Sequence, residues 1–294
     1  MILGCKMLNN SPLRYPGGKS RVSGFVAQLI RNNNIVKGNY VEPFAGGAGV
    51  ALNLLFNATV DNIYINDKDR AIYAFWFAIT QNTEQFIEKI SRTEITILEW
   101  EKQREIQRNK MDVSLFDLGF STFFLNRTNR SGIIMGGAIG GKQQAGTWKL
   151  DVRFNKEKLI SKILKIASYK NQIHIENKDV IEFLKDNVAN LDVDNTLIYL
   201  DPPYYEKGKK LYMNSFNHAE HENLYNQINT MKHLWIVSYD DNENIHKIYK
   251  EKRNITYPLR YSAGTKCIGS EVMFASDNLI VDVDCNPLLF NKAA

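Results

Sequence analysis

Short apolar runs that end at polar turns recur along this chain, and helical stretches separate them. Continuous apolar runs bounded by Gly, Asn and Asp are typical of strands buried on both faces, as in a parallel sheet. The sequence therefore predicts an α/β fold with a largely parallel sheet. The expected strands are 40–41, 62–65, 172–175, 197–200, 234–237, 255–260 and 279–283, and the clearest expected helices are 50–56 and 71–79.

This pattern changes in the middle of the chain, between about 81 and 170. Charge-rich helical segments there give way to a cluster of Asn and Arg and then to a glycine-rich stretch at 136–146. A chain of 294 residues with 44% hydrophobic side chains can bury one large core and still carry an inserted region. We therefore expect one domain built from 1–80 and 171–294, and an insertion at 81–170.

Charge and cysteine content indicate which partners and which cellular compartment the sequence favours. The 37 basic and 32 acidic residues give a net charge of +5, which fits a polyanionic partner without requiring one. Cys5, Cys267 and Cys285 are scattered without C-x-x-C spacing, so neither a disulfide framework nor a metal site is expected. No apolar run reaches membrane-spanning length. These features favour a monomeric cytoplasmic protein with no metal and no membrane partner.

The four residues Asp201-Pro202-Pro203-Tyr204 directly follow the expected strand 197–200. An exocyclic amine of adenine or cytosine is a poor nucleophile until well-placed acceptors hold its hydrogens. The Asp201 carboxylate can supply one acceptor and the Pro202 carbonyl another, since paired prolines fix φ and carry no competing N–H groups. Tyr204 offers a flat face on which an extruded base can stack. The alternative interpretation is an ordinary turn.

Three glycines, Gly46, Gly47 and Gly49, lie between the strand at 40–41 and the helix at 50–56. Glycines at such a position let the backbone approach a ligand closely, and the first N–H groups of the helix can meet that ligand. The G-x-G-x-x-G spacing of a dinucleotide site is absent. No Lys or Arg lies inside the loop, which fits a positively charged methyl donor such as S-adenosyl-L-methionine.

Further candidate residues follow strands or lie in a tight turn. Asp67, after 62–65, can accept both hydroxyls of a ribose, or it can be a helix cap. Asp179, after 172–175, would fall near the adenine of an adenosine cofactor or form a surface turn. Near the start of the chain, Lys19 can reach a carboxylate and Tyr15 can pack on a ring, although turns also contain such residues without a function.

Taken in order, the segments 15–19 and 42–49, Asp67 and the turn 201–204 resemble the DNA adenine methylase family of the Dam type. The resemblance spans most of the chain. It implies a Rossmann-like methyltransferase sheet with an inserted, mainly helical target-recognition region that carries a hairpin. The stretch 123–132 resembles the recognition hairpin of that family, whereas 136–146 departs from its pattern.

The resemblance and the loop chemistry together assign residues to two sites. The catalytic turn would consist of Asp201, Pro202, Pro203 and Tyr204. The S-adenosyl-L-methionine site would consist of Tyr15, Lys19, Pro43, Phe44, Gly46, Gly47, Gly49, Asp67, Asp179 and Asp201.

Polar side chains in the insertion are candidates for contact with double-stranded DNA. Paired hydrogen bonds from Arg suit guanine edges, and those from Asn or Gln suit adenine edges, although each side chain can equally contact phosphate or solvent. The candidate DNA-binding residues are Asn126, Arg127, Asn129, Arg130, Lys142, Gln143 and Gln144.

We therefore expect methyl transfer from S-adenosyl-L-methionine to the N6 amine of a flipped adenine in double-stranded DNA, with no metal and no covalent intermediate. Ring-carbon methylation of cytosine uses a cysteine on a Pro-Cys turn, and no cysteine here follows a proline. Two alternatives remain open: a methyltransferase that acts on RNA or another planar amine, and a catalytically silent DNA-binding regulator. The biological role is also open, either as the modification part of a restriction-modification system or as a phage-borne or orphan methylase.

Overall fold

The computed structural model describes residues 10–14, 19–206, 216–261, 267–281 and 286–288. The chain forms two compact units, each with its own helices. Unit 1 consists of Met1–Asn9, Lys19–Asn66 and Lys178–Ala294, and unit 2 consists of Asn10–Gly18 and Asp67–Asn177. The domains expected from the sequence were 1–80 with 171–294, and 81–170. Unit 2 is larger than that insertion, because it also includes α3 (Arg70–Gln81) and the separate segment Asn10–Gly18.

The described strands form a seven-stranded sheet in the order β3-β2-β1-β4-β5-β7-β6. Strand β1 pairs in parallel with β2 and β4, and β4 pairs in parallel with β5. Strand β7 is antiparallel to both of its neighbours, β5 and β6. The strands are β1 (Asn39–Glu42), β2 (Asn62–Asn66), β3 (Ile173–Glu176), β4 (Thr196–Leu200), β5 (Leu234–Asp240), β6 (Arg253–Tyr261) and β7 (Cys267–Ala275).

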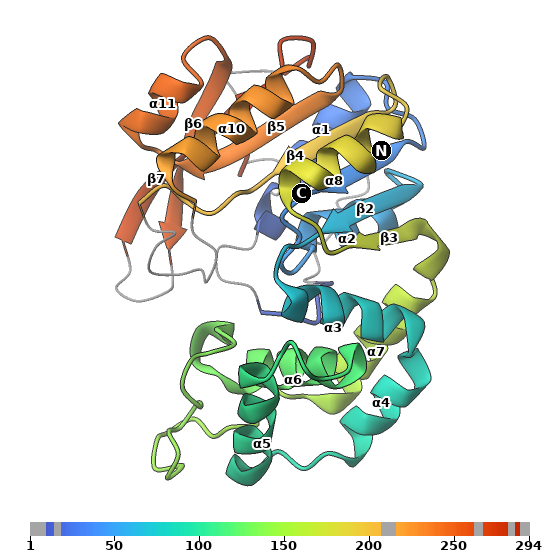
Figure 1. Ribbon diagram of the computed structural model, residues 1–294, viewed down its shortest axis with the longest axis vertical. Helices are drawn as coiled ribbons and strands as arrows, with labels where there is room; N and C mark the ends of the chain where they lie inside the picture. The colour runs from blue at the N-terminus through green and yellow to red at the C-terminus, as the bar shows by residue number, and fades with distance from the viewer. Residues whose placement is uncertain (1–9, 15–18, 207–215, 262–266, 282–285, 289–294) are drawn as a thin grey trace. The chain divides into compact units, whose positions relative to one another are not determined.

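Helices of unit 1 cover both faces of its strands, α8 and α10 on one face and α1 and α2 on the other (Figure 1). Every residue of β4 and β5 is buried, as the continuous apolar runs predicted. Ile198, Leu200 and Trp235 pack in one large apolar cluster with Phe183 of α8 and Leu224 of α10. Among the described residues, the helices of unit 1 are the 3-10 turns η1 (Lys19–Val22) and η4 (Val188–Asn190) and the α-helices α1 (Ser23–Asn32), α2 (Gly49–Phe56), α8 (Val180–Asp186), α10 (His218–Asn229) and α11 (Glu243–Ile248).

Unit 2 is mainly helical, and its core is aromatic. Phe75 stacks on Phe123 with ring centroids 6.0 Å apart, and Phe86 meets Phe123 edge-on at 5.6 Å. Gly119 lets α6 approach α3 closely, because a Cβ atom there would lie 2.4 Å from the carbonyl oxygen of Ala74. Its described helices are α3 (Arg70–Gln81), α4 (Thr83–Arg92), α5 (Ile97–Arg108), α6 (Leu115–Thr128), α7 (Lys156–Ala167) and the 3-10 turns η2 (Arg130–Gly132) and η3 (Lys170–Gln172).

Local caps explain where four helices of unit 2 begin. Side-chain oxygens of Asp69, Thr96, Ser114 and Asn155 each accept a hydrogen bond from a backbone N–H in the first turn of α3, α5, α6 and α7, respectively. Such caps satisfy N–H groups that have no partner inside the helix. The start of each of these helices is therefore encoded locally.

Two structural predictions from the sequence were wrong. The last strand is β7 (Cys267–Ala275), whereas 279–281 is not a strand and 282–283 lies outside the described residues. The hairpin expected at 123–132 is instead the end of α6 followed by η2. The continuous burial of Leu118 to Leu125 favours helix there, and only an isolated antiparallel bridge joins Asn129 to Ala138.

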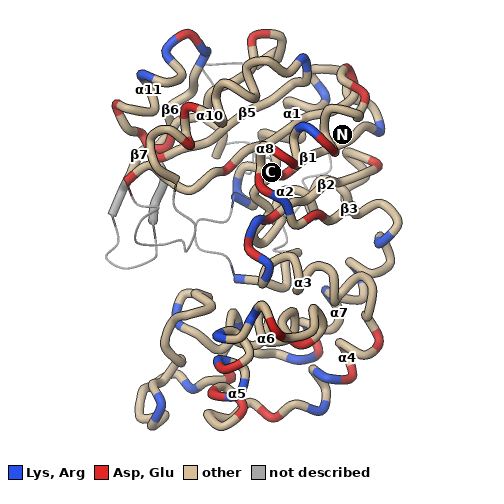
Figure 2. Tube along the Cα trace, in the orientation of Figure 1, with Lys and Arg blue, Asp and Glu red and all other residues tan. Residues whose placement is uncertain are grey.

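Among the described residues no helix combines the length and apolar character that a membrane span requires. Basic and acidic positions are interspersed along the chain (Figure 2).

Candidate active site

The candidate active site lies at the carboxyl ends of β1 and β4, which are neighbours in the sheet. Chain connections depart in opposite directions from this pair, because β2 follows β1 on one side and β5 follows β4 on the other. In open α/β sheets ligands bind outside the carboxyl ends of the strands at such a switch point. β1 leads into the glycine loop, and β4 leads directly into Asp201.

The Asp201 carboxylate is held from two sides. Its Oδ1 accepts a hydrogen bond of 2.8 Å from the Ser238 hydroxyl and lies 3.2 Å from the Lys19 ammonium nitrogen. Burial raises the pKa of Asp201, nearby Lys19 opposes that rise, and Glu271 adds to it. The side chain remains 28% exposed. The carboxylate is thus fixed in direction and still reachable by a substrate.

Lys19 begins η1 and lies in the centre of a buried network. Its ammonium group donates to the Tyr204 hydroxyl at 2.6 Å and to Glu271 Oε1 at 2.9 Å. Burial alone would lower the pKa of Lys19, but the carboxylates of Asp201 and Glu271 outweigh burial and hold the pKa well above its ordinary value. Lys19 therefore stays charged and joins Asp201 to Tyr204. The structure brings these three predicted site residues together.

Glu271 on β7 is a site residue that the sequence reasoning missed. The carboxylate is fully buried, and it accepts hydrogen bonds from Lys19, from the Tyr204 hydroxyl and, at 2.7 Å, from the Tyr257 hydroxyl. A buried charge is stable only when it is paired and hydrogen-bonded in this way. The available signal was a single acid inside an otherwise apolar run at 271–275.

Tyr204 is held by its hydroxyl. Burial raises its pKa well above the ordinary value, so the hydroxyl keeps its proton and donates it to Glu271. The residue is 4% exposed, and the Lys19 nitrogen lies 4.9 Å from the ring centroid, at the hydroxyl end of the ring. Lys19 and Glu271 therefore hold the buried ring in place through its hydroxyl.

The main chain of the turn is anchored at its end. Asp240, the last residue of β5, accepts hydrogen bonds from the backbone N–H of Tyr205 at 3.0 Å and of Glu206 at 3.4 Å. Pro202 is buried and Pro203 is partly exposed. Asp240 is a second residue that sequence reasoning did not identify, because its role depends on strand pairing.

The glycine loop is shaped by positive φ angles and by Glu42. Gly46 and Ala48 have φ of 45° and 44°, respectively, and a Cβ atom on Gly49 would lie 2.6 Å from the Ser20 hydroxyl. Glu42 accepts hydrogen bonds of 3.0 Å from the Ala51 N–H and 3.0 Å from the Tyr40 hydroxyl. Burial raises the pKa of Glu42 to about 8, so this carboxyl is protonated at neutral pH. Glu42 therefore ties the end of β1 to the start of α2.

The other residues assigned to the cofactor have local roles in the structure. Asp179 caps α8 by accepting from the Ile181 N–H at 3.0 Å, and Asp67 in unit 2 accepts from the Asp69 N–H at 2.9 Å. At the end of β2, Asn66 donates to the Pro43 carbonyl at 3.1 Å, which fixes the loop. Tyr15 lies outside the described residues. Within the described residues no group of His, Cys, Asp or Glu is arranged to hold a metal ion.

Two of the residues predicted to read bases are structural instead. Asn126 is buried and bonds with Arg14 N, Arg14 O and Gly132 O at 2.7 to 2.9 Å. Asn129 is buried, accepts from Trp100 Nε1 at 2.6 Å and donates to Ile133 O and Ile134 O. Amides with all these partners cannot turn toward a base edge without losing them. The prediction of base contact was therefore wrong for both.

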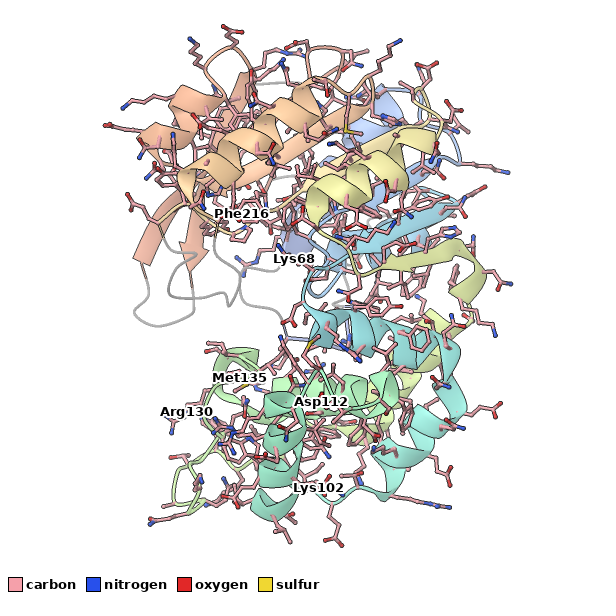
Figure 3. The ribbon with its side chains drawn as sticks, in the orientation of Figure 1. Lys68, Lys102, Asp112, Arg130, Met135 and Phe216 are labelled. Carbon is pink, nitrogen blue, oxygen red and sulfur yellow. The ribbon has the colours of Figure 1, made fainter. Side chains whose placement is uncertain are left out.

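The remaining candidates in the insertion are more accessible. Gln144 is partly buried and stabilises its own loop by donating to Ile139 O at 2.8 Å and accepting from Leu150 N at 2.8 Å. Lys142 and Gln143 are exposed, and Lys142 pairs with Glu101 at 2.9 Å. Arg130 is also exposed and lies at the outer edge of unit 2 (Figure 3). These side chains can meet a partner.

A carboxylate at the end of β4 beside a glycine loop at the end of β1 is the arrangement expected of a methyltransferase with a Rossmann-like sheet. The chain belongs to the family of D12 class N6 adenine-specific DNA methyltransferases, whose sequence model matches residues 15–261. The resemblance seen in the sequence is thereby confirmed. The protein is an adenine-specific DNA methyltransferase.

Individual relatives are more distant. The chain is 24% identical over 214 residues to the Type II methyltransferase M.MjaIII of Methanocaldococcus jannaschii, a match that covers 67% of this chain and 70% of that protein. A putative RNA methyltransferase from Pyrococcus horikoshii aligns with a TM-score of 0.42 and 9% identity over 90% of this chain and 85% of that chain. The putative methyltransferase yhhF from Escherichia coli aligns with a TM-score of 0.33 and 10% identity over 88% and 87% of the two chains.

Proposed function

We propose that this methyltransferase moves a methyl group from S-adenosyl-L-methionine to the N6 amine of an adenine flipped out of a defined sequence in double-stranded DNA. The family supports the adenine and the DNA. The observation that carries the mechanism is the Asp201 carboxylate, which is oriented by Lys19 and Ser238 and yet remains 28% exposed.

The residues around the switch point fit this methyl donor. α2 begins after the left-handed Ala48, whose side chain cannot cap the helix, and Glu42 accepts from the Ala51 N–H. The N–H groups that precede Ala51 in this first turn suit a carboxylate such as that of the methionine part. We assign the donor to the residues predicted from the sequence, with Gly46, Gly47 and Gly49 forming the loop. Asp67 and Asp179 are proposed for the ribose and the adenine because each follows a strand of the sheet. S-adenosyl-L-methionine supplies the electrophilic methyl group when it is bound.

The chain's own groups would make the amine reactive. Asp201 and the Pro202 carbonyl accept its two hydrogens, which frees the nitrogen lone pair for in-line attack on the methyl carbon. The attack forms the N–C bond, breaks the S–C bond and leaves a proton to be lost from the nitrogen. We assign stacking of the base to the ring of Tyr204, whose hydroxyl is held by Lys19 and Glu271.

We assign the catalytic role to unit 1 and target recognition to unit 2. The paired site residues Lys19, Asp201, Tyr204 and Glu271 all belong to unit 1. The accessible candidates for DNA contact, including Arg130 and Gln143, all belong to unit 2. A defined target sequence is supported by the relative M.MjaIII, which is named a Type II methyltransferase. A monomeric cytoplasmic enzyme remains our expectation.

The proposal is tested with tritiated S-adenosyl-L-methionine and two substrates in parallel, plasmid DNA and total RNA. We expect tritium in the DNA only. Digestion of that DNA to nucleosides should recover the tritium in N6-methyl-2′-deoxyadenosine. Tritium in RNA alone would show that RNA, and not DNA, is the substrate. Tritium in neither nucleic acid would favour a DNA-binding regulator without catalytic activity. Long-read sequencing of DNA from cells that express the gene then identifies the target sequence.

A further inference from the structure

Four cationic side chains of unit 2 gather without a neutralising acid: Arg14, Arg127, Arg153 and Lys162. Within the described part of the chain none of them forms an ion pair with Asp or Glu. Other cations of the same unit do, such as Lys89, whose nitrogen lies 2.7 Å from a carboxylate oxygen.

Specific hydrogen bonds bring together the segments that carry Arg14, Arg127 and Lys162, which lie far apart in the sequence. Arg153 is near enough for its charge to act on Arg14 and Arg127. Lys162 on α7 donates to the Ser11 carbonyl at 3.0 Å. Three residues later, the Arg14 N–H donates to Asn126 Oδ1 at 2.7 Å, and the Arg14 carbonyl accepts from Asn126 Nδ2 at 2.9 Å. Arg127 is the next residue on α6. The segment 11–14 thus lies against both α6 and α7.

Close packing fixes the position of Arg14. A Cβ atom on Gly132 would lie 2.2 Å from the Arg14 carbonyl oxygen, and Gly132 has φ of +77°. The Arg14 guanidinium also donates to the Asn129 carbonyl at 3.2 Å. The close approach of Arg14 to the end of α6 is therefore built into the backbone.

Charge repulsion within the group is substantial. Burial, followed by the charges of Arg14 and Arg153, lowers the pKa of Arg127 to about 10. Burial, followed by the charge of Arg127, lowers the pKa of Lys162 to about 8. Both side chains remain mainly charged at neutral pH. Arg127 Nε is also buried without a hydrogen-bond partner among the described residues. Such a group is relieved by an anion that accepts several hydrogen bonds.

We propose that Arg14, Arg127, Arg153 and Lys162 bind a backbone phosphate of the DNA duplex. Guanidinium groups match phosphate oxygens with paired N–H donors, and one phosphate can accept from several of them. Arg153 is exposed and the other three are partly exposed, so a phosphate can reach the group from solvent. Arg127 then contacts the DNA backbone rather than a guanine edge. The choice of DNA as the polyanion rests on the proposed function.

Duplex binding without any methyl donor tests this site. The probe is a fluorescently labelled DNA duplex of about 20 base pairs. Its affinity is measured by fluorescence anisotropy at KCl concentrations from about 50 to about 300 mM, a range over which phosphate contacts weaken strongly. We expect Arg127→Met to weaken binding about tenfold at the lowest salt and to reduce the slope of log K against log salt by about 0.9, the contribution of one phosphate contact. Lys162→Met should act in the same direction.

The matched control is Arg108→Met, which removes an arginine from the end of α5 that pairs with Glu105 at 2.8 Å. This variant should keep the wild-type slope. Because Arg127 is repelled by its neighbours, Arg127→Met should also melt at the wild-type temperature or above it in the absence of DNA. Unchanged affinity and slope in both Arg127→Met and Lys162→Met, or tighter binding of an RNA duplex of the same sequence, would overturn the proposal.

Failure of this site is distinguishable from failure of the proposed function. Wild-type protein that forms N6-methyladenine in DNA, combined with Arg127→Met and Lys162→Met variants that bind duplex normally, contradicts the phosphate site alone. Wild-type protein that binds duplex with the expected salt slope and forms no methylated base contradicts the enzymatic mechanism alone.

Discussion

The ammonium nitrogen of Lys19 lies 2.9 Å from Oε1 of the fully buried Glu271, and the same nitrogen lies 3.2 Å from Oδ1 of Asp201. One cation thus pairs with two acids, one fully buried on β7 and one partly exposed at the end of β4. This arrangement couples the stability of unit 1 to the orientation of its catalytic turn.

Replacement of Lys19 by methionine should therefore destabilise the protein and abolish methyl transfer. Removal of one partner of a buried ion pair typically costs about 3–5 kcal/mol, because the other charge stays buried and unpaired. Thermal or urea unfolding measures the loss. The control is Lys252→Met, since Lys252 is equally buried but its partner Asp277 is exposed. Equal unfolding free energies for the two variants would contradict the buried network.

The two tyrosines that donate to Glu271 should separate stability from catalysis. Tyr257→Phe removes one hydrogen bond to Glu271 and should cost about 1.5–3 kcal/mol of unfolding free energy. Tyr204→Phe removes a hydrogen bond to Glu271 and another from Lys19, so it should cost at least as much. Only Tyr204 belongs to the catalytic turn. We expect kcat to fall about tenfold in Tyr204→Phe and to stay near wild type in Tyr257→Phe. Equal kcat values for the two variants would remove the positioning role of the Tyr204 hydroxyl.

The protonated Glu42 predicts a pH dependence of stability. The pKa of Glu42 is about 8 in the folded protein and 4.5 as its ordinary value. Between pH 4.5 and about 8 the folded protein keeps a proton on Glu42 that the unfolded chain has lost. The contribution of Glu42 to the free energy of unfolding is therefore greatest below about pH 4.5 and falls as the pH rises toward 8. The slope reaches about 1.4 kcal/mol per pH unit. Glu42→Gln, which resembles the neutral form, should flatten the dependence in urea unfolding measured from pH 5 to 8. A slope unchanged in the variant would show that Glu42 is ionised.

Gly119 should be intolerant of any side chain. A Cβ atom there would lie 2.4 Å from the Ala74 carbonyl oxygen, so Gly119→Ala must push α6 away from α3 at a cost of about 1–3 kcal/mol. Gly137→Ala is the control, because a Cβ atom at that position meets nothing within 4 Å. Melting temperatures of the two variants measure the difference. A Gly119→Ala protein as stable as the control would contradict the close helix contact.

The sequence predicted those parts of the fold and the site that depend on local pattern. The strands near 62–65, 197–200 and 234–237 were confirmed, because each combines a continuous apolar run with a polar turn. The turn at Asp201 lies at the end of β4 as expected. The proximity of Lys19 to a carboxylate was anticipated from its Gly/Pro turn, although the particular acid could not be chosen.

Other features depend on contacts that no local pattern reveals. Strand β7 was missed because Gly269, Ser270 and Glu271 interrupt its apolar run, and Glu271 is tolerated there only through Lys19 and two tyrosines from distant segments. Asn126 was placed among the DNA-contacting residues because its real partner, the backbone of Arg14, lies 112 positions away in the sequence. Polar residues buried by long-range partners look the same in a sequence as polar residues that face a ligand.

The central claim is that the Asp201 carboxylate activates the adenine amine, and Asp201→Ala tests it most directly. The measurement is the initial rate of tritiated methyl incorporation into duplex DNA, with calorimetric binding of S-adenosyl-L-methionine and melting temperature as checks on the variant. We predict that wild-type protein forms N6-methyladenine and that folded Asp201→Ala protein forms it at least about a thousandfold more slowly. A rate within about tenfold of wild type would contradict the assignment of Asp201 and the mechanism built on it.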